Sequence, residues 1–180
     1  MQRAIPIASF DDIPAEFHGT PVERLVAWHN GFGEGQEHVT RAEILIGMCM
    51  DNRKKLRIPE NFAFILRSGG GNMRPSEFKV SFAVAVGGVR AIAIIVHNHC
   101  GMVGLSSRRE QFIEGLIDAG WERENAEQHF DSYAPLFEIG NEIDFVLAEA
   151  KRLRGRYPKV LVAPLLYNVE DNRLYCLREV

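Results

Sequence analysis

Two apolar runs in this chain each end abruptly in residues that can bind a metal or carry charge. The run at 43–48 is followed by Cys49-Met50-Asp51-Asn52-Arg53. The run at 91–96 is followed by His97-Asn98-His99-Cys100-Gly101. Such β-branched and aliphatic runs are typical of parallel strands buried on both faces. Because ligands of open α/β sheets bind beyond the carboxyl ends of the strands, we predict that both segments meet at one edge of the sheet.

Cys49, His97 and Cys100 are the candidate metal ligands. Thiolate and imidazole together favour zinc, and three protein ligands leave the fourth position of a tetrahedron for water or substrate. The spacing of His97 and Cys100 lets one tight turn present two ligands, although it is a weak signal alone, since a single Cys is usually a small buried hydrophobe. Its combination with Cys49 on a separate strand makes a zinc site the better interpretation.

Asp51 and Arg53 are the candidate catalytic residues. In an extended chain they would lie on the same side as Cys49, and the guanidinium would keep the carboxylate ionised and oriented. Such a carboxylate can accept a hydrogen bond from metal-bound water, or displace that water as the fourth ligand. The alternative is a surface salt bridge worth less than about 1 kcal/mol.

The remaining pattern predicts one α/β domain over 1–180, with a mostly parallel central sheet flanked by helices and a possible N-terminal helical arm at 1–35. Pro164 suggests a strand at a sheet edge or with a bulge. The glycines at 69–71 allow positive φ or close approach to a ligand, or form a plain flexible loop. Further strands are expected at 62–66, 159–167 and 174–177, and helices at 21–29, 75–87, 108–119, 126–136 and 141–154.

Composition narrows the class of protein. With 180 residues, 46% of them hydrophobic, the chain can bury one core. The net charge of -3 argues against a nucleic-acid partner or an anionic membrane surface. No apolar run approaches the roughly 20 residues of a membrane span, and no signal peptide is evident. We therefore expect a cytoplasmic, reducing location, where metal binding or catalysis explains the cysteines better than disulfides do.

The segments 49–53, 64–70 and 97–102 resemble, in order and spacing, the motifs of the β-class carbonic anhydrases. The resemblance covers most of the chain from 44 to 102 and extends more loosely over 167–174. It implies the fold of that family and zinc bound by the two cysteines and the histidine named above. It also implies a catalytic Asp-Arg dyad, and homodimers or higher homo-oligomers whose active clefts lie at subunit boundaries.

Two positions depart from the pattern of that family. His99 stands where many members have Asp, and Ser68 where many have Asn. Neither change removes a ligand, but both bear on substrate preference and proton transfer. His99 is either an outer proton carrier, with an unperturbed pKa near 6.5, or a solvated loop residue.

The resemblance implies a lyase, a carbonic anhydrase that reversibly hydrates carbon dioxide to bicarbonate through a zinc-bound hydroxide. Zinc lowers the pKa of its water from 15.7 to about 7 in well-known cases. Because two thiolates donate more charge than imidazoles would, we predict a higher value here and activity that rises through mildly alkaline pH. Two alternatives remain: a hydrolase of carbon disulfide or carbonyl sulfide with a narrow apolar tunnel, and a non-catalytic zinc-binding homologue in which Asp51 closes the shell.

Overall fold

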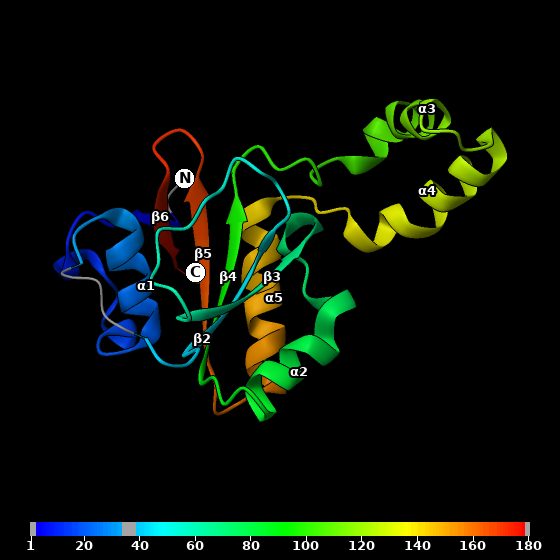
Figure 1. Ribbon diagram of the computed structural model, residues 1–180. Helices are drawn as coiled ribbons and strands as arrows, with labels where there is room; N and C mark the ends of the chain where they lie inside the picture. Colours follow the sequence, from blue (N-terminus) through cyan, green and yellow to red (C-terminus); the bar gives the residue numbers. More distant parts are fainter. Residues whose placement is uncertain (1–2, 34–38, 179–180) are drawn as a thin grey trace.

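A six-stranded mixed sheet forms the centre of the computed structural model, which describes residues 3–33 and 39–178 (Figure 1). Four neighbouring strands run parallel. Two further strands, at one side of the sheet, each pair antiparallel with the strand before them. This mostly parallel α/β architecture confirms the predicted fold class. From one edge to the other the strands are β3 (Ala63–Ser68), β2 (Ile44–Cys49), β4 (Ala91–His97), β5 (Leu161–Asn168), β6 (Arg173–Leu177) and β1 (Ala4–Pro6).

The two apolar runs of the sequence form β2 and β4, which lie side by side at the centre of the sheet. Every residue of both strands is buried. Their parallel register pairs Ile44 with Ala91 and Met48 with Ile95. Because the two strands run in step, Cys49 and His97 leave the sheet at the same edge.

Helices cover both faces of the sheet (Figure 1). Residues of α1 pack into the core on one face, whereas residues of α2 and α5 pack into the core on the other. The Thr20 hydroxyl caps the start of α1, and the Asn141 side chain caps the start of α5. The helices are α1 (Pro21–Asn30), α2 (Glu77–Ala85), α3 (Arg109–Asp118), α4 (Arg123–Phe137) and α5 (Glu142–Arg156), with short 3-10 turns at Phe10–Asp12, Ala15–Phe17, Gly69–Gly71, Arg74–Ser76 and Leu105–Arg108.

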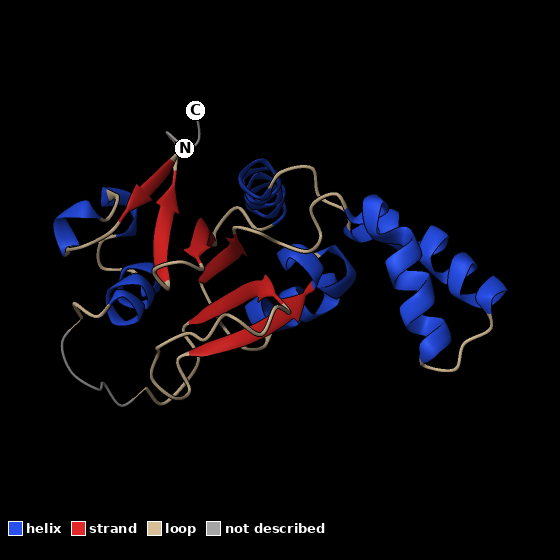
Figure 2. Cartoon of the chain, turned by 90° about the horizontal axis from the view of Figure 1, so that it is seen from above, coloured by secondary structure: helices blue, strands red, loops and turns tan. Residues whose placement is uncertain are grey.

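Helices α3 and α4 form a hairpin that projects away from the sheet (Figure 2). Both helices were expected, but α4 begins earlier than predicted and includes Pro135 within its last turn. The helix ends two residues later, at Phe137. Among the described residues, no helix has both the length and the apolar character needed to cross a bilayer.

The prediction that Pro164 marks an edge strand or a bulge is wrong for β5 as a whole. This strand lies between β4 and β6, and its register with β4 is continuous. The ladder with β6 begins only at Leu165, so 161–164 has a strand partner on one side. Proline is tolerated there because the strand is locally an edge. On this stretch the carbonyl oxygen of Val162 accepts hydrogen bonds from Arg154 at 3.2 and 2.7 Å.

His29 of α1 is a buried histidine, 1% exposed, packed against Tyr167 at a ring separation of 5.3 Å. Its Nδ1 accepts a hydrogen bond from the backbone N–H of Arg57. Burial lowers the pKa of His29 to about 4, so the ring stays neutral in the folded protein at neutral pH.

We expect acid to destabilise the fold through His29. An unfolded histidine has a pKa near 6.5, so between about pH 6.5 and 4 the unfolded chain binds a proton that the folded chain does not. The free energy of unfolding should therefore fall as the pH drops through this window, by up to about 3 kcal/mol. Urea unfolding at pH 7 and pH 4.5 measures this loss, which His29→Gln should reduce. Equal losses in the variant and the wild type would contradict the assignment.

Candidate metal centre

The structure brings Cys49, His97 and Cys100 together at the carboxyl edge of the sheet. Cys49 ends β2, His97 ends β4, and Cys100 lies in the turn three residues further on. Their ligand atoms all lie within 4.8 Å of one another, and all three residues are buried. The convergence expected from the two strand ends is thus present in the folded chain.

The donor atoms of this cluster fit a zinc ion. A tetrahedral site with Zn–S bonds of about 2.3 Å places two sulfurs about 3.8 Å apart. The Sγ atoms of Cys49 and Cys100 are 3.9 Å apart. His97 Nδ1 lies 2.9 Å from the carbonyl oxygen of Asn98, an arrangement that keeps the proton on Nδ1 and the lone pair on Nε2. That Nε2 is buried and has no hydrogen-bond partner within the described chain, an unfavourable state that a metal ion would relieve.

The two thiols shift each other's pKa in opposite directions. A hydrogen bond from Cys100 lowers the pKa of Cys49, and the neighbouring His97, the backbone N–H of Asp51 and the charge of Lys54 act in the same direction. The same contact with the Cys49 sulfur raises the pKa of Cys100. These shifts favour the thiolate form of Cys49, and metal binding would release the protons that the two thiols carry.

Asp51 and Arg53 form a close ion pair beside the cluster. The Asp51 carboxylate accepts hydrogen bonds from the backbone N–H of Arg53 at 2.9 Å and from its guanidinium Nη2 at 2.7 Å. The bonded guanidinium is the main reason that the pKa of Asp51 lies well below its usual range. Arg53 also donates to the carbonyl oxygen of His99, so it connects the two loops that carry the cysteines and the histidine.

Asp51 lies next to His97 and outside the ligand cluster. Its Oδ2 is 3.8 Å from His97 Nε2. Among the described residues, the group whose ligand atoms all lie within 4.8 Å of one another does not include Asp51. The carboxylate thus lies near His97 Nε2, while its hydrogen bonds go to Arg53.

Lys54 is a feature of the site that the sequence analysis missed. Its side chain is 0% exposed, and its Nζ lies 3.9 Å from Asp51 Oδ1. Burial lowers the pKa of Lys54, whereas the nearby Cys49, Asp51 and Cys100 raise it. Lys54 is one of three consecutive basic residues after Asn52, and no sequence signal marks it as buried.

His99 lies on the loop between the histidine and cysteine ligand candidates. Its side chain is 70% exposed, and its Nε2 is 2.9 Å from Glu170 Oε1. Asn98 holds the same loop to the turn after β5, because its Oδ1 accepts a hydrogen bond from the backbone N–H of Val169. The loop is therefore held in place by contacts with the turn after β5, outside the Cys-His-Cys cluster.

The glycines at 69–71 pack behind the end of β2. All three are buried, and Gly70 and Gly71 have φ of 62° and 76°. A Cβ on Gly71 would lie 3.4 Å from the carbonyl oxygen of Ile95 and 3.7 Å from the backbone nitrogen of Cys49. These are ordinary contact distances, so the positive φ is what explains why glycine is favoured here.

Gly71→Ala and Gly88→Ala should destabilise the protein by similar amounts. Both positions have positive φ, at 76° and 74°, so each substitution costs about 1–2 kcal/mol of backbone strain. At Gly88 a Cβ meets nothing within 4 Å, and at Gly71 its nearest neighbours lie at 3.4 Å or more, an ordinary contact distance, so neither substitution adds an overlap. Urea unfolding of both variants with a chelator present compares the two costs, and a clearly larger cost at Gly71 would contradict this expectation.

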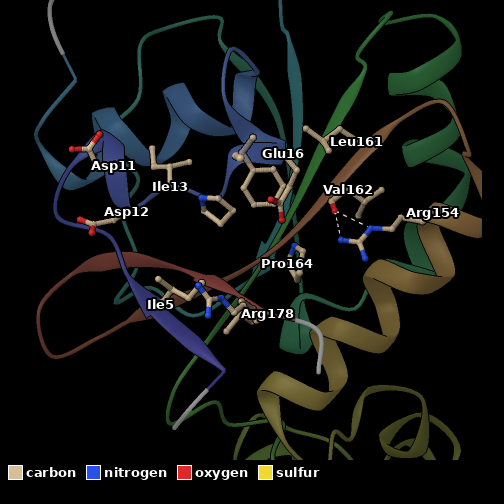
Figure 3. Close-up of a pocket in the computed structure, with 14 residues that line it drawn as sticks. Ile5, Asp11, Asp12, Ile13, Glu16, Arg154, Leu161, Val162, Pro164 and Arg178 are labelled. Carbon is tan, nitrogen blue, oxygen red and sulfur yellow. Dashed lines mark hydrogen bonds between the residues drawn. The ribbon is translucent and has the colours of Figure 1, made fainter.

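A cavity of about 720 Å³ lies at the other end of the sheet (Figure 3). Ile13, Phe17, Arg154 and Pro164 are among its lining residues, and none of the predicted site residues lines it. It opens beside the start of β5, six residues along the strands from His97, which is about 20 Å at 3.3 Å per residue. This cavity is separate from the metal cluster.

In this α/β sheet two cysteines and a histidine converge from adjacent parallel strand ends. This arrangement places the chain among candidate metal-dependent proteins. Within that class, the fold is that of the β-carbonic anhydrases, as the motifs predicted. No protein-family model matches the chain. No curated protein sequence matches it either.

The chain is similar to several solved structures. The carbonic anhydrase from Glaciozyma antarctica matches with a TM-score of 0.64 at 22% identity, over 92% of this chain and 100% of that one. The β-carbonic anhydrase isoform I from Trichomonas vaginalis matches with a TM-score of 0.64 at 16% identity, over 82% and 90% of the two chains. A carbon disulfide hydrolase in its apo form matches with a TM-score of 0.56 at 20% identity, over 78% and 80%. These similarities establish the fold.

Proposed function

We propose that this protein is a zinc-dependent carbonic anhydrase, which reversibly hydrates carbon dioxide to bicarbonate. The observation that carries the proposal is the pairing of a buried Cys-His-Cys cluster with an ionised carboxylate that lies beside it and is held by its own arginine. A metal site alone could be structural. A site with three protein donors and an anchored carboxylate beside it is typical of catalysis on a small molecule.

Cys49, His97 and Cys100 would hold the zinc ion. Zinc supplies Lewis acidity, which makes water a nucleophile near neutral pH. The hydrogen bond between His97 Nδ1 and the carbonyl oxygen of Asn98 keeps the Nε2 lone pair available and fixes the orientation of the ring. Burial of both cysteines excludes bulk water from the sulfurs.

Asp51 would orient the attacking water. Because Arg53 keeps its pKa well below the usual range, the carboxylate is an acceptor at every pH at which the enzyme would work. It can accept a hydrogen bond from the water and direct the oxygen lone pair at the carbon of carbon dioxide. The same low pKa makes it a poor carrier of protons to solvent.

The position of Asp51 supports an open site. In a tetrahedral zinc site a nitrogen and an oxygen ligand lie about 3.3 Å apart, since each bond is about 2.0 Å long. Asp51 Oδ2 is 3.8 Å from His97 Nε2, and its hydrogen bonds go to Arg53. This favours an active site with a free fourth position over a non-catalytic homologue in which the carboxylate closes the shell.

A stopped-flow assay of carbon dioxide hydration tests the proposal. The protein is loaded with zinc, its metal content is measured, and its rate is followed from pH 6.5 to 9. We expect a rate proportional to bound zinc that rises through mildly alkaline pH. Zinc-loaded protein without activity at pH 8 to 9 would favour the non-catalytic alternative, and a rate that is flat with pH would count against a titrating nucleophile.

Hydrolysis of carbon disulfide or carbonyl sulfide is the second candidate function. The observation that favours it is the fold similarity to a carbon disulfide hydrolase. Both reactions add water to a linear triatomic carbon compound, so the same donors and the same Asp51 would serve. Supplying the zinc-loaded protein with carbon disulfide and measuring hydrogen sulfide separates the two, because a carbonic anhydrase would release little.

We also propose a homodimer or higher homo-oligomer and a cytoplasmic location. A reducing compartment would keep the two thiols at the metal cluster available for zinc, because they are close enough to be at risk of oxidation. Carbon dioxide and bicarbonate would be the small-molecule partners.

A further inference from the structure

Lys54 is a buried cation beside the candidate metal centre. Its side chain is 0% exposed, and its Nζ makes no hydrogen bond within the described part of the chain. An ammonium group offers three donors, and an interior position that satisfies none of them is costly. A methionine side chain of similar length would fill the same space without this cost. Folding alone therefore does not explain why a lysine stands here.

Asp51 connects Lys54 to the candidate metal ligands. Its Oδ1 is 3.9 Å from Lys54 Nζ, and its Oδ2 is 3.8 Å from His97 Nε2. The hydrogen bonds of the carboxylate go to Arg53, so its contact with the ammonium is purely electrostatic. The Lys54 and His97 nitrogens, both buried and without a hydrogen bond among the described residues, thus lie beside the two oxygens of one carboxylate. The ammonium therefore belongs to the immediate surroundings of the metal centre.

The loop after β2 is tied down so that Lys54 stays in the interior. Arg67 of β3 donates from Nη1 to the carbonyl oxygen of Cys49 and from Nη2 to that of Lys54, both at 3.3 Å. One guanidinium thus holds both ends of the segment 49–54 against the neighbouring strand. The next residue, Lys55, is exposed to solvent. Two consecutive lysines therefore have opposite environments, and only the first can act on the site.

The charges around the site show what this ammonium changes. Ligand cysteines bind a metal as thiolates, and a ligand histidine binds as the neutral ring. The two thiolates and Asp51 together exceed Arg53 and Lys54 by one negative charge, and a divalent ion leaves the whole site with one positive charge. Without Lys54 the loaded site would be neutral. A bound monoanion is therefore neutralised in this protein, whereas it would leave an uncompensated negative charge if residue 54 were apolar.

We propose that Lys54 is a positioning residue whose buried charge makes the open position of the metal prefer a monoanion to a neutral ligand. A buried ammonium attracts an anion more strongly than an exposed one does, because the effective dielectric constant is lower in the interior. Bicarbonate, the product of the proposed reaction, is such a monoanion, so Lys54 would favour its formation and its capture in the reverse reaction. The inference rests on the proposed zinc site and goes beyond the roles of Asp51 and Arg53.

Cobalt-substituted protein tests the proposal without turnover. Cobalt(II) can replace zinc in a tetrahedral site, and its visible absorption changes when a fourth ligand binds, so ligand binding can be titrated. Thiocyanate is the monoanionic probe, and imidazole, at pH 8, is the neutral one. We expect Lys54→Met to raise the dissociation constant of thiocyanate about tenfold or more, and to leave that of imidazole within about twofold of the wild type.

Lys55→Met is the matched control. It removes the same charge one residue further along, but from an exposed side chain that water and salt screen. This variant should bind both probes as the wild type does. Unchanged thiocyanate binding in Lys54→Met would overturn the proposal. Equal weakening of both probes would also overturn it, because it would show that Lys54 supports the shape of the site rather than its charge.

The same experiment separates this proposal from the proposed function. Cobalt uptake is measured first, and a wild type that takes up no cobalt would refute the metal site and with it both proposals. Cobalt uptake without an effect of Lys54→Met on thiocyanate would refute the role of Lys54 alone. The expected loss of thiocyanate affinity in a protein that does not hydrate carbon dioxide would support the role of Lys54 and refute the proposed activity.

Discussion

Cys49→Ala should lose its zinc and, with it, the hydration of carbon dioxide. The substitution removes one of the three donor atoms that lie within 4.8 Å of one another, and the remaining pair cannot fill a tetrahedral site. Loss of an outer partner of a zinc ligand already costs about 10–100-fold in metal affinity, so loss of a ligand should cost more than about 100-fold. Metal analysis after dialysis and stopped-flow kinetics measure both effects.

Cys176→Ala is the matched control for this experiment. Cys176 is also a buried free cysteine, but it lies in β6, where it pairs with Leu165. Burial raises its pKa to about 12, so it is a neutral thiol that contributes to the core. The control variant should keep zinc and full activity at some cost in stability. If Cys49→Ala keeps both its zinc and its rate, the metal site has been assigned wrongly.

The centre of the fold and the donors of the site were predictable because they follow from local pattern. A strand that is buried on both faces must be apolar throughout. The runs that form β2 and β4 can therefore be recognised in the sequence alone. Polar residues directly after such runs must lie at a sheet edge. Parallel pairing of β2 with β4 then places Cys49 and His97 at the same end of the sheet.

The features that were missed depend on contacts between distant segments. The Lys54 side chain is buried with its amino group 3.9 Å from Asp51 Oδ1, and a run of basic residues in the sequence does not show that. Pro164 suggested an edge strand, but β5 lies inside the sheet; only the ladder with β6, which begins one residue after the proline, leaves this position locally at an edge. The periodicity of 108–136 predicts helices, but only the folded chain shows that they project from the sheet.

Asp51→Asn should keep zinc but reduce the hydration rate by about 10²-fold or more, the usual range for a group that handles a proton in the transition state. The amide has the size of the carboxylate but no charge, and it would turn an N–H toward either Arg53 or the water. Because the pKa of Asp51 in the folded protein lies below its usual range, the carboxylate is ionised throughout the range of the assay. The deficit of the variant should therefore persist at every pH from 6.5 to 9.

Asp171→Asn gives a close control, because 171–173 repeats the tripeptide Asp-Asn-Arg of 51–53. In both turns the aspartate Oδ1 accepts a hydrogen bond from the backbone N–H of the arginine two residues on, at 3.0 Å and 2.9 Å. Only the first turn lies beside His97. The control should therefore keep the full rate. If Asp51→Asn matched it in rate, the carboxylate would have no catalytic role, and if Asp51→Asn lost zinc instead, Asp51 would be a ligand that closes the site.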